Sequence, residues 1–115
     1  MKNPLTLTTA LFAMTLASHA ETPPDGADRK IAEALPTKAY AAPQKARKLL
    51  VFAKTNGFRH ASIATGKLAL TELGKKTGAF ETTITEELDE FEVDKLRHYD
   101  AVLFLSTTMN VFAPK

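Results

Sequence analysis

Two uninterrupted apolar runs place the strongest constraint on the fold of this chain. They are 49-LLVFA-53 and 101-AVLFL-105, and every residue in each run is apolar. A strand that is buried on one face alternates apolar and polar residues, whereas a strand buried on both faces is apolar throughout. The two runs therefore predict strands inside a parallel sheet.

The segment between the runs predicts one helix and one further strand. Apolar residues and glycine recur at helical spacing along one side of residues 63–77, which indicates a helix. We expect Ser62 to cap its start, Gly78 to end it, and Gly66 to permit close contact with the sheet. The stretch 80-FETTIT-85 alternates between two faces, as is typical of a half-exposed strand at a sheet edge.

This order of elements predicts the fold class. A strand, a helix, a strand, a short acidic connection and a strand, joined by right-handed crossovers, give a parallel sheet of order 2-1-3. We therefore expect the first half of a doubly wound α/β domain. The acidic connection, 86-EELDEFEVD-94, lacks the spacing of a calcium loop, and we interpret it as solvated.

The first 20 residues have the features of an export signal. Lys2 gives a positive start, residues 5–17 are largely apolar, and Ser18 and Ala20 are small residues at the positions that a signal peptidase reads. The apolar run is too short to span a bilayer as an anchor. We therefore expect a signal peptide over residues 1–20, cleavage after Ala20, and a secreted or periplasmic protein.

The next segment, residues 21–47, predicts a linker. It contains prolines amid alanine, lysine and threonine, although a short helix is allowed over residues 28–35. The folded domain is expected to begin near Lys48, and we expect it to continue beyond Lys115.

Composition excludes several classes of function. The chain has no cysteine, so it has no disulfide, no thiolate nucleophile and no cysteine metal site. Its formal net charge of +2 argues against nucleic acid or an anionic membrane as a partner. No pattern indicates a metal or another cofactor, and we expect neither.

The polar loops after the two apolar strands form the predicted ligand site. In a doubly wound sheet, ligands bind beyond the carboxyl ends of the strands at the point where the strand order reverses. Residues 54–60 follow one apolar strand and residues 106–110 follow the other. We therefore expect these loops to line a common crevice.

Each polar or aromatic residue of the first loop has a structural and a functional interpretation. We expect Gly57 to allow positive φ in a tight turn, and Phe58 to cover the end of the core rather than stack on a sugar. Arg59 could pair with a carboxylate from the second loop or hold an anionic or carbonyl ligand. His60 lies where a helix dipole disfavours imidazolium, so it is either a neutral donor or base or a residue that fixes the loop. His98 lies at the opposite end and is interpreted as structural.

With these residues in view, the chain resembles a known family. The runs 48-KLLVFAKTNGFRHASI-63 and 99-YDAVLFLSTTMNV-111, in this order around a helix, resemble the ThuA-like (trehalose utilisation) domain. The resemblance covers about residues 48–111, the N-terminal part of that domain. It implies a flavodoxin-like fold of the class I glutamine amidotransferase type without the nucleophile, and a role in carbohydrate or keto-sugar metabolism.

The resemblance also implies a set of site residues. Phe58, Arg59 and His60 match the first loop of the family, and the paired threonines match the second. Where the family usually has Gly-Asp after those threonines, this chain has Met109-Asn110, which implies the loss of an acidic partner. The candidate ligand-binding residues are Lys54, Thr55, Phe58, Arg59, His60, Thr107 and Thr108.

Two classes of function follow from this set. In an enzyme, His60 would act as a general acid or base and Arg59 would hold an oxygen of the substrate. In a non-catalytic carbohydrate-binding or interaction module, the same crevice would bind a sugar without turnover. The sequence leaves the substrate, the reaction and the oligomeric state open.

Overall fold

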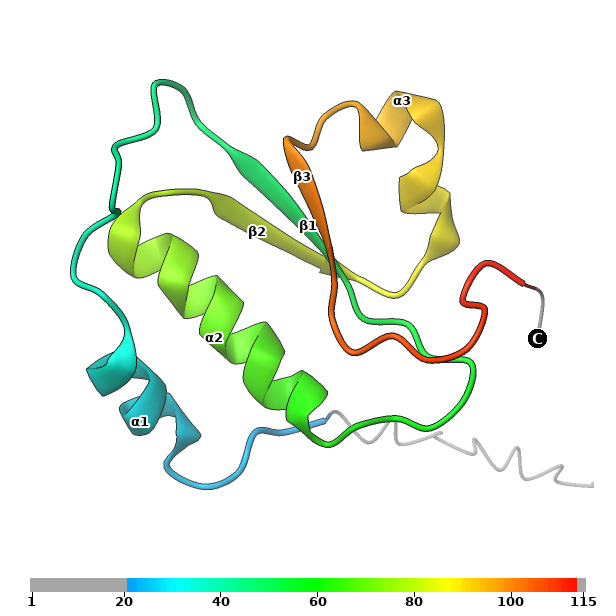
Figure 1. Ribbon diagram of the computed structural model, residues 1–115, viewed down its shortest axis with the longest axis horizontal. Helices are drawn as coiled ribbons and strands as arrows, with labels where there is room; N and C mark the ends of the chain where they lie inside the picture. The colour runs from blue at the N-terminus through cyan, green and yellow to red at the C-terminus, as the bar shows by residue number, and fades with distance from the viewer. Residues whose placement is uncertain (1–20, 114–115) are drawn as a thin grey trace, which may run out of the picture.

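The computed structural model describes residues 21–113 and contains a three-stranded parallel sheet (Figure 1). Its strands are β1 (Lys48–Phe52), β2 (Glu81–Thr85) and β3 (Ala101–Phe104), in the order β2-β1-β3. The predicted α/β class and the predicted strand order 2-1-3 are therefore confirmed. The expected signal peptide lies outside the described residues.

Strand β1 is the centre of the core. Leu50, Val51 and Phe52 have no exposed surface, so β1 is buried on both faces as predicted. Strand β3 differs, because it pairs with β1 on one side only and Phe104 is 48% exposed. Among the residues that the structure describes, the second apolar run is therefore not buried on both faces, and that expectation is wrong.

Helix α2 (Ser62–Thr77) covers one face of the sheet. It begins one residue earlier than the predicted range, so Ser62 lies inside the helix. The predicted capping role of Ser62 is wrong: Ala61 occupies the cap position and makes no side-chain capping bond. The first turn is closed instead by the backbone, where the Ile63 amide donates to the His60 carbonyl at 3.1 Å.

Two glycines of this region behave as the sequence predicted. A β-carbon on Gly66 would lie 2.8 Å from a methyl carbon of Leu105, which directly follows β3. The helix therefore contacts the sheet closely at this point. Gly78 ends the helix in the left-handed conformation, with φ 65°, and its amide donates to the Gly74 carbonyl at 2.9 Å.

The opposite face is partly covered by the acidic connection, and Phe104 on β3 stays 48% exposed. This connection folds into η1 (Leu88–Phe91) and α3 (Val93–Leu96), which lie across the sheet from α2 (Figure 1). The Phe91 ring packs edge-on against Phe52, with ring centroids 4.8 Å apart. No residue of η1 or α3 is buried, so the connection is largely solvated as expected, but Phe91 also contacts the core.

The segment before the domain forms a helix that packs on α2. This helix, α1 (Ala27–Ala34), lies within one residue of the short helix that the sequence allowed. Lys76 of α2 donates to the carbonyls of Ala32 at 2.6 Å and Leu35 at 3.0 Å, so the end of α1 is held against the domain (Figure 1). No helix within residues 21–113 is long and apolar enough to cross a membrane.

Candidate ligand site at the carboxyl ends of the strands

The loops after β1 and β3 lie side by side, as the topology predicts. Thr55 and Thr108 form a parallel bridge, and the Asn56 amide donates to the Thr108 carbonyl at 3.1 Å. The Thr108 hydroxyl accepts from the Gly57 amide at 3.3 Å and donates to the Phe58 carbonyl at 2.9 Å. Thr108 therefore fixes the first loop rather than pointing freely toward a ligand.

Asn56 is a residue of this site that the sequence analysis missed. Its side-chain amide donates to the carbonyls of Asn110 at 2.6 Å and Ala113 at 3.3 Å. These bonds run from the first loop to the second and to the chain after it. Asn56 therefore holds the two loops together. Its position inside the predicted ligand loop, between Thr55 and Gly57, is the sequence feature that could have identified it.

The second loop is strained. Ser106 has φ 48° and Met109 has φ 59°, both in the left-handed region that favours glycine. A non-glycine residue in this region costs about 1–3 kcal/mol, and such residues gather at ligand sites and switches. Glycine would suit this conformation better than the methionine at position 109 does.

Gly57 has a different role from the expected one. It is not among the glycines with positive φ, so the predicted turn conformation is wrong. A β-carbon at this position would instead lie 2.8 Å from the sulfur of Met109. The second loop therefore approaches Gly57 closely, through a side chain that is itself exposed.

Phe58 and His60 form an exposed aromatic pair. Their ring centroids are 4.8 Å apart and their planes are nearly perpendicular. Phe58 is 72% exposed, so the expectation that it covers the end of the core is wrong. That end is already filled, because Phe112 stacks on Phe52 with centroids 6.1 Å apart.

Arg59 is held by groups at the ends of β1 and β2. Its Nη1 donates to the Ala53 carbonyl at 3.2 Å and approaches the Thr55 hydroxyl at 3.5 Å. Both terminal nitrogens bind the Glu86 carboxylate, at 2.6 Å and 3.3 Å. The carboxylate that the sequence analysis expected from the loop after β3 therefore comes from the residue that follows β2.

Two further charged residues, Glu21 and Lys67, join Arg59 and Glu86 in a cluster of four charges. The Glu21 carboxylate binds Nε of Arg59 and also Nη2, the latter at 2.8 Å. The Lys67 ammonium lies 2.9 Å from the Glu86 carboxylate and 3.8 Å from that of Glu21. We call this set, Glu21, Arg59, Lys67 and Glu86, the Arg59 cluster. The resemblance implied that Met109-Asn110 removes an acidic partner, but Glu21 and Glu86 both supply a carboxylate to Arg59.

Hydrogen bonds within the Arg59 cluster shift the pKa values of Glu21, Arg59 and Glu86 toward their charged forms. Hydrogen bonds from Glu21 and Glu86 raise the pKa of Arg59 above its usual value, and the bond from Arg59 lowers the pKa of Glu21. Burial raises the pKa of Glu86, but hydrogen bonds from Lys67 and Arg59 outweigh it, and the net pKa is lowered. Both carboxylates are therefore ionised at neutral pH.

A family model described as ThuA, trehalose utilisation, matches residues 48–115. The chain belongs to the ThuA family. The match begins at the first residue of β1 and includes all three strands and both loops. Membership links this ThuA chain to trehalose utilisation. No similar protein was found among curated proteins or among solved structures.

The remaining predicted residues of the ThuA site lie at the same edge of the sheet. Lys54 and Thr107 are half-buried there, in the loops after β1 and β3. The predicted residues thus divide into the Thr55–Thr108 seam, the exposed Phe58–His60 pair, and Arg59, which leans toward β2. Within residues 21–113, no three histidine, aspartate or glutamate side chains come together as metal ligands.

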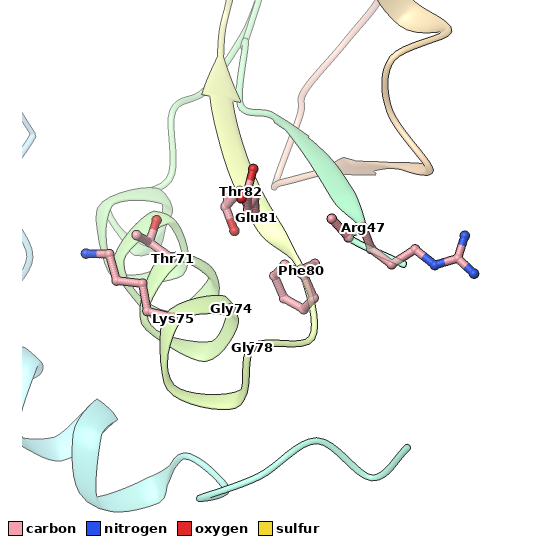
Figure 2. A pocket seen from close by; sticks show the side chains of 9 residues that line it. Arg47, Thr71, Gly74, Lys75, Gly78, Phe80, Glu81 and Thr82 are labelled. Carbon is pink, nitrogen blue, oxygen red and sulfur yellow. The ribbon is translucent and has the colours of Figure 1, made fainter. Parts of the chain in front are cut away.

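A separate hollow of about 400 Å³ lies at the opposite end of the ThuA sheet (Figure 2). It is lined by Ala46, Arg47, Thr71, Gly74, Lys75, Gly78, Phe80, Glu81 and Thr82. In Figure 2 the Arg47 side chain extends away from α2, and Phe80 lies between helix and strand. The hollow lies at the amino ends of the strands, whereas doubly wound sheets bind ligands at the carboxyl ends. It does not include the predicted site residues.

Proposed function

We propose that this ThuA chain is an exported protein that binds a sugar or sugar derivative, of the trehalose or keto-sugar type, at the carboxyl ends of β1 and β3. One observation carries the proposal. An exposed aromatic and imidazole pair, Phe58 and His60, flanks an arginine whose orientation is fixed by Glu86. The three residues are consecutive at the edge of the sheet where this fold binds ligands.

The three side chains provide the groups that a sugar needs. The exposed ring of Phe58 offers an apolar face for the C–H groups of a pyranose. The Nε and Nη2 edge of Arg59, which Glu21 occupies in the structure, would offer charged hydrogen-bond donors to a hydroxyl, carbonyl or carboxylate oxygen of a ligand that takes the place of Glu21. His60 can donate or accept a proton at an adjacent oxygen. The half-buried Thr107 adds a hydroxyl from the second loop.

A non-catalytic carbohydrate-binding or interaction module is the second candidate, and one observation favours it. The His60 imidazole is exposed and packs edge-on against Phe58, a side chain that cannot hold it in one tautomer. Catalytic bases are usually oriented by a third polar group. Binding with the same residues but without turnover would agree with this geometry.

One experiment separates the two candidates. Trehalose, glucose and a keto-sugar are titrated calorimetrically into the full-length protein, and turnover of each is followed by product analysis. In an enzyme, His60→Gln abolishes turnover and leaves affinity within a few-fold, because glutamine keeps a donor but transfers no proton. In a binding module, no sugar is turned over and His60→Gln changes little. His98→Gln, at the opposite end of the sheet, is the matched control.

The proposal fails on one clear result. If none of these sugars binds to the folded protein, neither the enzyme nor the module described here exists at this edge of the sheet.

A further inference from the structure

One edge of the Arg59 guanidinium is fixed by the sheet, and the other is held by a group that does not belong to the sheet. The fixed part binds Glu86, the Ala53 carbonyl and the Thr55 hydroxyl, all at the carboxyl ends of β1 and β2. The edge formed by Nε and Nη2 binds Glu21. The sheet thus orients the arginine and presents that second edge outward.

Glu21 occupies this edge in the geometry of a bound carboxylate. Its two oxygens accept from two neighbouring nitrogens of the guanidinium, the paired arrangement by which arginine recognises carboxylates. A neutral sugar hydroxyl would use only one of these donors. The edge is therefore built for a planar anion.

The charges of the Arg59 cluster also favour a carboxylate at this edge. Without Glu21, the cluster contains two positive groups, Arg59 and Lys67, and one negative group, Glu86. Lys67 lies 3.8 Å from the Glu21 carboxylate, so it also faces the outer position. Glu21 thus supplies the negative charge that balances the cluster, and another carboxylate in its place would do the same.

Glu21 is held less firmly than Glu86. Residues 21–24 have no regular secondary structure, whereas Glu86 directly follows β2. The two carboxylates are similarly exposed, Glu21 at 31% and Glu86 at 39%, so the difference between them lies in the backbone that carries them. A partly exposed ion pair is screened by solvent and salt, so a competing carboxylate can take the place of Glu21.

We propose that the Nε and Nη2 edge of Arg59, together with Lys67, is the binding position for the carboxylate of a sugar acid, and that Glu21 is an internal occupant which this ligand displaces. The choice of a sugar acid rests on the proposed function, because Phe58 and His60 precede and follow Arg59 in the sequence. The carboxylate itself rests only on the Arg59 cluster. Displacement releases residues 21–24 from the site while α1 remains packed on α2.

An internal occupant lowers the apparent affinity of the ligand that competes with it. If Glu21 holds the edge about 90% of the time, its removal raises the apparent affinity about tenfold. We therefore expect Glu21→Gln to bind glucuronate about 5- to 10-fold more tightly than the wild type. Glucose has no carboxylate, so its affinity should be the same in both proteins.

Calorimetric titration of sodium glucuronate, glucose and sodium acetate into the full-length protein tests this. The variants are Glu21→Gln and, as a matched control on the same N-terminal segment, Glu33→Gln, which removes an exposed glutamate of α1. Glu33→Gln should bind every probe as the wild type does. Equal glucuronate affinity in Glu21→Gln and wild type overturns the inference.

A second measurement observes the arginine directly. In ¹⁵N-labelled protein, the Nε–H signal of Arg59, assigned by its loss in Arg59→Lys, should shift when glucuronate is added and stay in place when glucose is added. An unchanged Arg59 signal at saturating glucuronate also overturns the inference.

The two proposals fail in different ways. If trehalose or glucose binds but Glu21→Gln gives glucuronate no advantage, the carboxylate position is wrong and the sugar function stands. If neutral sugars do not bind, but glucuronate and acetate bind more tightly to Glu21→Gln, the carboxylate position stands and the sugar function is wrong.

Discussion

The sulfur of Met109 lies 2.8 Å from the place where a β-carbon on Gly57 would be. The contact joins the loops after β1 and β3, and Met109 enters it with a φ of 59°. Because the methionine side chain is flexible and 80% exposed, it can move away from an added methyl group. We therefore expect Gly57→Ala to lower the free energy of unfolding by about 1 kcal/mol or less.

Gly74→Ala should be more destabilising than Gly57→Ala. Its β-carbon would lie 2.5 Å from the backbone oxygen of Phe80, which cannot move without displacing the start of β2. Overpacking costs about 1–3 kcal/mol and alanine regains about 1 kcal/mol as the better helix former, so we expect a net loss of up to about 2 kcal/mol. Gly66→Ala should lie between, because it meets the side chain of Leu105. Urea melts of the three variants in the full-length protein give the order, and a Gly57→Ala variant less stable than Gly74→Ala would contradict it.

The sequence predicted the sheet because its signals are local. Five consecutive apolar residues at 49–53 indicate a strand that is buried on both faces. Gly78 marks the end of the helix before it, because glycine readily adopts the left-handed conformation in which helices end. The Arg59 cluster could not be predicted in this way. Lys67 and Glu86 look like ordinary surface residues of a helix and an acidic connection until the crossover brings them beside Arg59.

The expectations for Gly57 and Phe58 were wrong because both residues also depend on contacts with residues distant in the sequence. Gly57 was interpreted from its own backbone freedom, whereas in the structure its distinctive feature is the close approach of the Met109 side chain from the second loop. Phe58 was assigned to the core because aromatic residues are usually buried, but Phe112 already occupies that position. Both outcomes depend on residues more than 50 positions away, as the Gly57–Thr108 bond (51 positions) illustrates.

Asp100 should make the free energy of unfolding fall at acidic pH. The hydrogen bond from Arg47, and then that from the Lys48 amide, lower its pKa from 3.8 to about 2. Because the folded-state pKa is below the unfolded one, the contribution is complete above about pH 4 and is lost as the pH falls toward 2. Asp100→Asn should therefore lose less stability than the wild type over this range. Urea melts at pH 5 and pH 3 measure the difference, and equal losses would show that Asp100 is not coupled to folding.

Glu86 should matter more for stability than its neighbour in sequence. Its carboxylate binds Arg59 and Lys67, so Glu86→Gln leaves two positive charges without their common partner. Since the side chain is 39% exposed, we expect a loss of only about 1 kcal/mol. Glu87→Gln, at an exposed position with the same change of charge, is the matched control. Thermal melts with equal midpoints for both variants would contradict this role.

Export can be checked by mass. The small residues Ser18 and Ala20 predict cleavage after Ala20, so that the mature protein begins at Glu21. The intact mass of the protein recovered from the periplasm of an expressing bacterium gives the answer. A mass that includes Met1 would show that no signal peptide is removed.

Binding of a sugar through Arg59 is the central claim, and Arg59→Ala tests it most directly. Charged hydrogen bonds contribute about 1.5–3 kcal/mol, so this variant should bind the sugar that the wild type recognises about 10- to 100-fold more weakly. Calorimetric titration into both full-length proteins, with thermal melts alongside, measures affinity in the folded fraction. A variant that melts earlier than the wild type but binds the sugar with equal affinity would show that Arg59 only supports the loop, and would contradict the account.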